Sequence, residues 1–325
     1  MNKEEIIAKV DEALASKHLD FKAKMAETYA LVDGKYVPTG WFTPVRDDKT
    51  DRFSVITGRS FSEQYVPIQH GDAFQVIGDM MEFADVEFKN IGSWGNGAGV
   101  YAQISIGNSM DIGSTDDKVG RYLSVVNSHD GSRALQILVT PYRFFCQNQI
   151  SKAITDARHN NRIISIHHSE MGQQRLREVA CAINAAEGEF VKSEEVYRRL
   201  ADRIIDMDEA REAMARCYPI PVYNGETPEK SRNRWERRVV GLIERFNRAD
   251  DGHLDRMTGW NLYNAIQGMY QHSAKRTATY EKSLIMGSIA KQAETSLATV
   301  QHILFDGDND RTFHPEFDRI FARTA

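Results

Sequence analysis

Cysteine is scarce in this 325-residue chain, which contains only Cys146, Cys181 and Cys217 and no C-x-x-C pair. This excludes a disulfide framework and a thiolate zinc site, and it is typical of a reducing compartment. No apolar run approaches the ~18 residues that span a bilayer, and the first residues lack the apolar core of a signal peptide. We therefore expect a cytoplasmic protein that makes no contact with a membrane.

Proline is scarce too, and the sequence has no internal repeat and no low-complexity linker. Pro219, Pro221 and Pro228 bracket the one conspicuous break in the second half, which predicts a loop between two helical groups. At 41% hydrophobic residues, the chain can bury one large core or two ordinary ones. We expect an N-terminal helix, a core, a helical region and a tail, which occupy residues 1–30, 31–165, 166–305 and 306–325.

Positive charge is in deficit overall, with a formal net charge of −5. Such a charge repels a polyanion at long range and argues against a protein that merely coats nucleic acid. The distribution is uneven, however: residues 1–130 carry 13 Lys/Arg and 20 Asp/Glu, whereas residues 131–248 carry 20 and 16. This distribution is compatible with a local basic surface in the middle of the chain, and equally with ordinary scatter.

Hydrophobic periodicity predicts strands in the first half of the chain and helices in the second. Val100, Ala102, Ile104 and Ile106 alternate with other residues in the pattern of a strand with one buried face. Residues 72–84 have helical spacing, with Asp72 and Gln75 as a capping pair. The predicted fold class is α+β: an antiparallel β-sheet in the order β-β-α-β-β-β, backed by helices and followed by a mostly helical C-terminal region.

Apolar helical faces predict an assembly of several copies. Residues 258–304 carry two such faces, which include Tyr263, Met269, Leu284 and Ile289. These faces are larger than a single contact with the sheet would cover, and exposed apolar patches usually mark an interface. We therefore expect a homo-oligomer formed through these helices.

Five basic residues that we call the first basic group lie around the end of the predicted sheet: Arg133, Arg143, Lys152, Arg158 and Arg162. Phosphates of a single strand need charge along a groove and planar side chains on which bases stack. Trp94 and Tyr101 on neighbouring strands are candidates for that stacking. The alternative is that the arginines solvate a helix and the aromatic side chains fill the second face of the sheet.

A second basic group, Arg234, Arg237 and Arg238, follows Pro228 on a predicted helix. Trp235 starts the apolar face of this helix, and Arg245 and Arg248 gather with the second basic group on the opposite side. This is a cationic stripe on a packed helix. The alternative is a solvated face whose arginines pair with the two glutamates of the same helix, Glu236 and Glu244.

Histidines are the strongest argument for an enzyme. His129, His159, His167 and His168 fall within forty residues, and such a cluster could bind a divalent metal and cleave phosphodiesters. The spacing is unspecific, however, and the neighbours His167 and His168 point in divergent directions on a strand or a helix. Cys146 follows two phenylalanines, which indicates a buried and inert thiol. The favoured reading of these residues is structural.

Three stretches in a fixed order carry a resemblance to a known family. They are Tyr65-Val66-Pro67-Ile68-Gln69, Ser128-His129-Asp130-Gly131-Ser132 and Thr140-Pro141-Tyr142-Arg143-Phe144-Phe145-Cys146-Gln147-Asn148. With a helix and a strand meander between the first two, this order resembles the phage/plasmid-like proteins of bacteriophages, plasmids and integrated elements. The core of that family is catalogued as a domain of unknown function, and the resemblance extends to about residue 305.

The predicted element order is also similar to the core of phage single-strand annealing proteins, of which the family would be a distant branch. This resemblance implies that Arg143 and Asn148 lie beside a groove for the DNA strand and that the C-terminal helices are peripheral. It further implies a ring or filament of subunits in a bacterial host cell. The chain departs from annealing proteins in its modest basicity, since their groove is usually more positive.

These observations together predict a non-catalytic protein that binds or anneals single-stranded DNA in phage, prophage or plasmid recombination, without cofactor or metal. A metal-dependent nuclease, or another nucleic-acid enzyme that uses the cluster of His129, His159 and His167, is the alternative. A third possibility is a protein that binds a host or phage protein on behalf of a mobile element.

Overall fold

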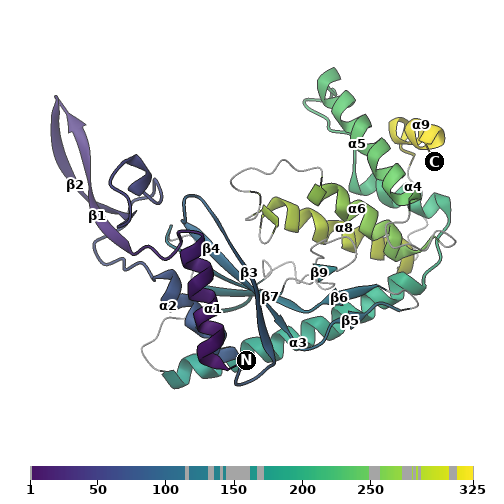
Figure 1. Ribbon diagram of the computed structural model, residues 1–325. Coiled ribbons are helices and arrows are strands. Elements are labelled where there is room, and N and C mark those ends of the chain that lie inside the picture. Colours follow the sequence, from purple (N-terminus) through teal and green to yellow (C-terminus); the bar gives the residue numbers. More distant parts are fainter. Residues whose placement is uncertain are drawn as a thin grey trace.

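The computed structural model describes residues 2–113, 117–130, 135–139, 142–143, 162–166, 172–248, 257–272, 280, 283–284, 287–306 and 313–324, with backbone alone for 142–143, 162–166 and 172–176. It has the predicted α+β architecture, with antiparallel sheets followed by a mostly helical C-terminal half (Figure 1). The helices are α1 (Lys3–Ser16), α2 (His70–Met80), α3 (Gly172–Asp202), α4 (Met207–Cys217), α5 (Glu229–Asn247), α6 (Gly259–His272), α8 (Ser288–Phe305) and α9 (Pro315–Thr324), with a 3-10 turn at Arg52–Ser54. The strands are β1 (Ala23–Val32), β2 (Lys35–Arg46), β3 (Val86–Trp94), β4 (Gly99–Ile106), β5 (Met110–Asp111), β6 (Lys118–Gly120), β7 (Tyr122–Ser128), β8 (Leu135–Val139), β9 (Tyr142–Arg143) and β10 (Arg162–Ile166).

The central sheet has five antiparallel strands in the order β10-β8-β7-β4-β3. The predicted buried face of β4 is confirmed, because Val100, Ala102, Ile104 and Ile106 all belong to the main core, but the opposite face is not open to water as expected. Residues of the opposite face form a separate small cluster of Trp94, Tyr101, Val126 and Leu138. The sheet therefore buries side chains on both faces in these strands.

Helices α1, α2 and α3 pack beside the sheet, and their buried apolar residues belong to the main core. Helix α1 begins with a capping box in which Asn2 and Glu5 satisfy each other's backbone N–H groups. Helix α2 begins at His70, two residues before the predicted start, so the predicted capping pair Asp72 and Gln75 is wrong. Its N-cap residue Gln69 instead uses its side-chain amide to hold the backbone of Ala23, with Oε1 accepting at 2.8 Å and Nε2 donating at 3.1 Å.

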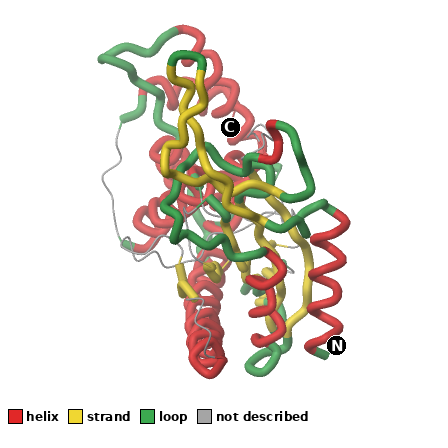
Figure 2. The backbone as a smooth tube through the Cα atoms, turned by 90° about the vertical axis from the view of Figure 1, so that its left-hand side faces the viewer, coloured by secondary structure: helices red, strands yellow, loops and turns green. Residues whose placement is uncertain are grey.

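Strands β1 and β2 form a two-stranded arm, residues 23–46, that projects from the body of the molecule (Figures 1 and 2). The turn consists of Asp33 and Gly34, both with positive φ (48° and 76°). Two successive residues of this kind form the tight turn whose twist matches the strands of a hairpin. The arm is separate from the central sheet, whereas the sequence analysis assigned both to one sheet.

The helical half joins the sheet half through α3, and one continuous cluster of buried side chains runs from Ile6 in α1 to Phe321 in α9. Residues 315–324 were expected to be part of a tail. They form helix α9 instead, which buries Phe317, Ile320 and Phe321. Every helix in the described part of the chain is too short or too polar to cross a lipid bilayer.

Three of the four side chains named for the apolar faces of residues 258–304 are covered within one copy of the chain, and Leu284 is half-buried. Tyr263, Met269 and Ile289 are buried, and α6 packs against α3, α5 and α8. The described part of the surface on which the predicted assembly was based is therefore mostly internal. The oligomeric state itself remains a prediction.

Candidate nucleic-acid interface

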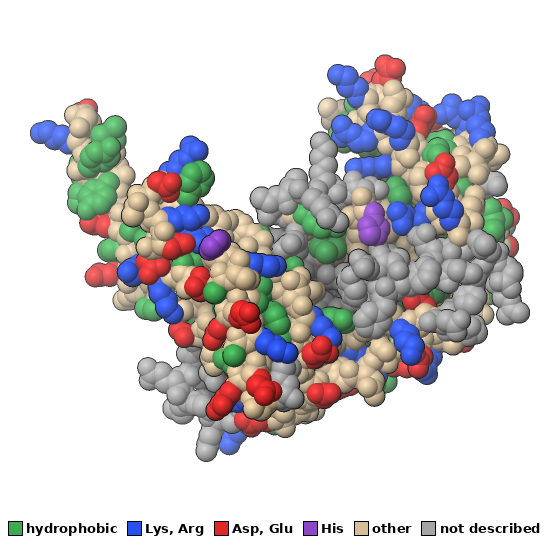
Figure 3. All heavy atoms as spheres, viewed as in Figure 1, with side chains coloured by type: hydrophobic (Ala, Val, Ile, Leu, Met, Phe, Trp, Pro, Cys, Tyr) green, Lys and Arg blue, Asp and Glu red, His purple; other side chains and the backbone are tan. Residues whose placement is uncertain are grey.

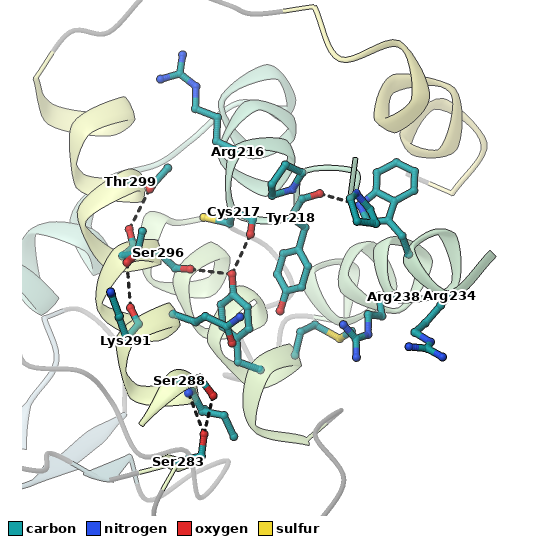
Figure 4. Close-up of a pocket in the computed structure, with 18 of the residues that line it drawn as sticks. Arg216, Cys217, Tyr218, Arg234, Arg238, Ser283, Ser288, Lys291, Ser296 and Thr299 are labelled. Atoms are coloured by element: carbon teal, nitrogen blue, oxygen red, sulfur yellow. Dashed lines mark hydrogen bonds between the residues drawn. The ribbon is translucent and has the colours of Figure 1, made fainter. Parts of the chain in front are cut away.

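A cleft of about 960 Å³ opens in the helical half among α4, α5, α6 and α8 (Figure 4). The loop between α4 and α5, which the three prolines predicted, forms part of its wall. Its basic residues are Arg216, Arg234, Arg238 and Lys291, and its aromatic residues are Tyr218, Tyr223, Trp235, Tyr270 and Tyr280. Two members of the second basic group, Arg234 and Arg238, thus face one cavity.

Two stacked phenol rings lie in the wall of the cleft. The ring centroids of Tyr218 and Tyr270 are 4.8 Å apart, with 14° between the planes. Tyr270 Oη donates to the carbonyl oxygen of Cys217 at 2.9 Å and accepts from Ser296 Oγ at 3.1 Å, which ties α6 to α4 and α8. Trp235 Nε1 donates to the carbonyl oxygen of Tyr218 at 2.9 Å and fixes α5 on the same loop. The wall is therefore held by hydrogen bonds from three sides.

Cys217, Tyr218 and Tyr270 in this wall stay neutral at physiological pH. Burial raises the pKa of Cys217 and of Tyr270 to about 12 each, and it also raises the pKa of Tyr218. A thiol that remains protonated is a poor nucleophile. The positive charge of the cleft is therefore not offset by an ionised thiol or phenol in its wall.

The basic residues of the cleft differ in whether they have acidic partners. Arg216 Nε pairs with the buried carboxylate of Glu212 at 2.6 Å, so its charge is compensated. Among the described residues, no carboxylate lies within ion-pair distance of Arg234, Arg238 or Lys291, and the described lining contains no Asp or Glu. These three side chains are exposed and give the cleft a net positive charge.

Helix α9 explains why the glutamates of α5 do not neutralise the second basic group. Arg319 of α9 forms an ion pair with Glu236, with 2.8 Å between Nη2 and Oε1. Glu244 pairs with Arg248 at 3.6 Å, one turn further along α5. The alternative, a solvated face whose arginines pair with Glu236 and Glu244, therefore holds in part: Glu244 pairs with Arg248 of that face, whereas within the described chain neither glutamate pairs with the second basic group. Lys and Arg side chains gather on the surface over α5 (Figure 3).

An anionic ligand with planar groups matches this arrangement chemically. Arg234 and Arg238 lie one helical turn apart, about 6 Å along the axis, so they can reach two different phosphates. Arg237 is exposed on the same helix and extends the charge beyond the cleft. Tyr223, which is 58% exposed, offers a free ring at the wall. Backbone charge and accessible rings are the two elements that proteins use to hold a single strand.

The first basic group cannot be assembled into a site in the same way. Arg133, Lys152 and Arg158 lie outside the described residues, as does Asn148. Arg143 belongs to β9, whose partner strand is β6, and Arg162 belongs to β10 at the edge of the central sheet. Only the backbone of these two residues is described.

Trp94 and Tyr101 do not form an exposed stacking platform. Each is 5% exposed, and both pack with Val126 and Leu138 on the second face of the sheet. The prediction that these rings stack on bases is therefore wrong. The other reading of the same pattern, in which they fill the second face, is the correct one.

His129 is part of a buried imidazole pair with His70. Its ring stacks on that of His70 with centroids 3.9 Å apart. His129 Nε2 donates to the carbonyl oxygen of Ile68 at 2.7 Å, so this nitrogen is occupied. Among the described residues, no group of three or more His, Cys, Asp or Glu could hold a metal ion. His159, His167 and His168, like Cys146, lie outside the described residues.

The surroundings of the pair keep both rings neutral. His70 Nδ1 accepts from Asn127 Nδ2 at 3.0 Å, which places the proton on Nε2, and that atom donates to the carbonyl oxygen of Gly97 at 3.1 Å. Burial lowers the pKa of His129 to about 4, and burial together with the neighbouring His129 lowers the pKa of His70. Phe21 closes the site, and a Cβ on Gly97 (φ 82°) would lie 2.7 Å from its ring.

Sequence reasoning missed two features of the cleft. Lys291 lies on α8, more than fifty residues from the second basic group, and the packing of α5 and α8 on α6 brings them to one cavity. Tyr223 lies in the loop that the prolines delimit. Its flanking prolines and its position beside a basic helix were the available signals.

The fold and the site together define an α+β protein whose helical half holds a cationic, aromatic-walled cleft. Residues 59–300 match the family model described as a domain of unknown function, DUF932, and the chain belongs to this family. The matched range begins after the arm and ends within α8. No curated protein and no solved structure matches the chain.

Proposed function

We propose that the chain binds single-stranded DNA without catalysing a reaction, and that it serves strand annealing in phage, prophage or plasmid recombination. The observation that carries this proposal is the charge of the cleft. Arg234, Arg238 and Lys291 line an aromatic cavity, and no described carboxylate neutralises them. Three exposed cations without a described acidic partner around one cavity attract a polyanionic ligand.

A single strand fits these features better than a duplex. In a duplex the bases are stacked and paired, so aromatic side chains have no free ring faces to contact. In a single strand the bases are free, and each can stack on a ring such as that of Tyr223 while its phosphate pairs with an arginine. The cleft volume of about 960 Å³ is at the upper end of the range for ligand pockets and accommodates an unstacked nucleotide.

The first basic group belongs to the same proposal. Arg133, Arg143, Lys152, Arg158 and Arg162, with Asn148, would extend the path of the strand toward the sheet, as the resemblance to annealing proteins implies. The proposal gives the helical half a larger part than that resemblance does, because the cleft lies in helices that were expected to be peripheral. The phage or plasmid context rests on the resemblance alone.

The nuclease alternative has little support in the described chain, because His129 is buried and hydrogen bonded. The Cys217 thiol that lines the cleft gives no support to an enzyme either, since its raised pKa keeps it protonated. Cleavage of the oligonucleotide in the presence of a divalent metal, lost on His159→Ala, would restore this alternative. A host-factor-binding role predicts no affinity for DNA.

Binding to a labelled single-stranded oligonucleotide should weaken steeply with salt. Three phosphate contacts in the cleft give a slope of about −2 in a plot of log K against log salt, because each contact to a single strand contributes ~0.7. Contacts from the first basic group would steepen it further. Fluorescence anisotropy between 50 and 200 mM salt (about a fourfold range) measures this slope.

The same titration should be run with EDTA, with magnesium and with duplex competitor. We expect affinity to be unchanged by the chelator and the oligonucleotide to remain intact. A mononucleotide that binds as tightly as the oligonucleotide would identify the cleft as a small-ligand site. A salt-independent affinity, or a preference for duplex, would contradict single-strand binding.

A further inference from the structure

Exposed apolar side chains gather on the arm, which lies outside the residues matched by the family model. Six of them, between 44 and 78% exposed, are Tyr29, Leu31, Val32, Tyr36, Val37 and Trp41. Figure 3 shows hydrophobic side chains along this projection. The pattern is unusual for a single exposed hairpin, since apolar residues of soluble proteins are normally exposed singly.

The pairing register places three of these side chains, Tyr29, Leu31 and Tyr36, on one face together with Pro38. Leu31 pairs with Tyr36, and Tyr29 pairs with Pro38. Cross-strand partners share a face, and so do residues two apart in one strand. Tyr29, Leu31, Tyr36 and Pro38 therefore form a continuous apolar face near the tip of the arm.

Charge is nearly absent from the same segment. From Thr28 to Trp41 the charged residues are Asp33 and Lys35, which lie in and beside the turn and cancel. A surface of this kind has nothing to offer the phosphates of a nucleic acid. It matches an apolar protein surface, and two such tips would not repel each other.

The base of the arm is firmly attached, so the exposed tip is held in a defined place. Arg46 at the end of β2 is buried and forms a bidentate pair with Asp48, with both nitrogen to oxygen distances between 2.7 and 2.8 Å. Its guanidinium also lies 3.9 Å from the centroid of the Phe21 ring. Bridges from Phe61 to Phe42 and from Val55 to Val45 cover the outer edge of β2 near the base.

We propose that the arm is a self-association element whose apolar face packs against the arm of a second copy of the chain. A two-stranded ribbon gains stability when another element packs on its apolar face, so the tip would be stabilised by a partner that is always present. A second copy is such a partner whenever the chain is made.

The exposed area is sufficient for such a contact. Side chains of this size, exposed to this degree, leave roughly 600 Å² of surface on each arm. Two arms that cover each other bury roughly 1,200 Å², which is the lower end of the range for specific interfaces. The same patch on both copies forms an isologous contact about a two-fold axis, which closes a dimer.

Replacing Tyr36 and Leu31 together by Lys tests the proposal in the full chain. We expect light scattering coupled to gel filtration at micromolar concentration to give a dimer for the unchanged protein and a monomer for the double variant. Val191→Lys is the matched control, because Val191 is 60% exposed on α3 and lies away from the arm. It should remain dimeric.

A second measurement covers the case in which the double variant fails to fold. A photoreactive phenylalanine analogue at Tyr36, in an equal mixture of ¹⁵N-labelled and unlabelled chains, should give mixed-isotope crosslinks to residues 28–41 of the other copy. A monomeric unchanged protein, a double variant that stays dimeric, or crosslinks outside the arm would each overturn the proposal. These outcomes do not depend on DNA binding, so they are separate from a failure of the proposed function.

Discussion

Replacing Arg234 and Arg238 together by Ala should weaken single-strand binding by roughly 30-fold at low salt. Each exposed charge-assisted contact to a phosphate contributes about 1 kcal/mol, and the loss of two corresponds to that factor. The slope of log K against log salt should also become shallower by about 1.4, because two phosphate contacts are lost. Thermal unfolding should stay nearly unchanged, since both side chains are exposed.

Arg248→Ala is the matched control for this pair of substitutions. Arg248 is on the same helix and exposed, but Glu244 already compensates its charge. Its loss should change affinity by about two-fold at most. The double variant Arg234→Lys with Arg238→Lys should keep the salt slope, because it keeps the charges. Equal losses in the control and in the Arg234/Arg238 Ala variant would mean that the contribution is general charge and not the cleft.

The free energy of unfolding should fall as the pH is lowered from about 6.5 toward 4. The pKa of His129 in the folded chain is about 4, below the ordinary value near 6.5 that it has when unfolded. Below pH 6.5 the unfolded state therefore takes up a proton that the folded state does not. The contribution of the neutral His129 to the free energy of unfolding is complete above pH 6.5, and about 3 kcal/mol of it is lost at pH 4. His70, whose pKa is lowered as well, acts in the same direction.

Urea unfolding at pH 7.5, 6 and 5 measures this effect, at values where most carboxylates are still ionised. Two charged groups act on the pair: Arg46 lowers the pKa of His70, and Asp130 raises the pKa of His129. His129→Gln should reduce the pH dependence in this window. A free energy of unfolding that is constant from pH 7.5 to 5 would contradict the account of the buried pair.

Local patterns predicted much of the fold because they depend on neighbours in sequence. Alternation in β4 and the apolar face of α5, from Trp235 to Phe246, follow directly from the strand and helix periods. Helix α9 was missed because its short apolar spacing, Phe317, Ile320 and Phe321, was treated as part of a polar tail. The separate arm was missed because the pattern of a strand does not state which sheet the strand joins.

The candidate site was less predictable, since it depends on contacts between distant segments. The pattern that places Trp94 and Tyr101 on the second face of the sheet does not say whether that face is covered. The charge of the second basic group depends on Arg319, about 80 residues away, because Arg319 pairs with Glu236, which lies on α5 among the arginines of that group. Lys291 reaches the cleft only through the packing of α8.

The proposed contact between arms limits how copies of the chain can assemble. Annealing proteins work as rings or filaments, and the resemblance predicts the same here. A two-fold contact between arms closes a dimer, so a ring or filament requires a second and different contact. Tyr263, Met269 and Ile289 in the helices of residues 258–304 are buried within one copy, so these three side chains do not provide that contact.

Photocrosslinking tests the central claim, that the cleft on α5 holds a single strand, most directly. An oligonucleotide that carries 5-iodouracil at several positions is irradiated with the unchanged protein, and the attached peptides are identified by mass spectrometry. The account predicts crosslinks at Tyr223 and Tyr280, which line the cleft, and their loss in the Arg234/Arg238 Ala variant. Crosslinks confined to residues outside the cleft, or unchanged in that variant, would contradict it.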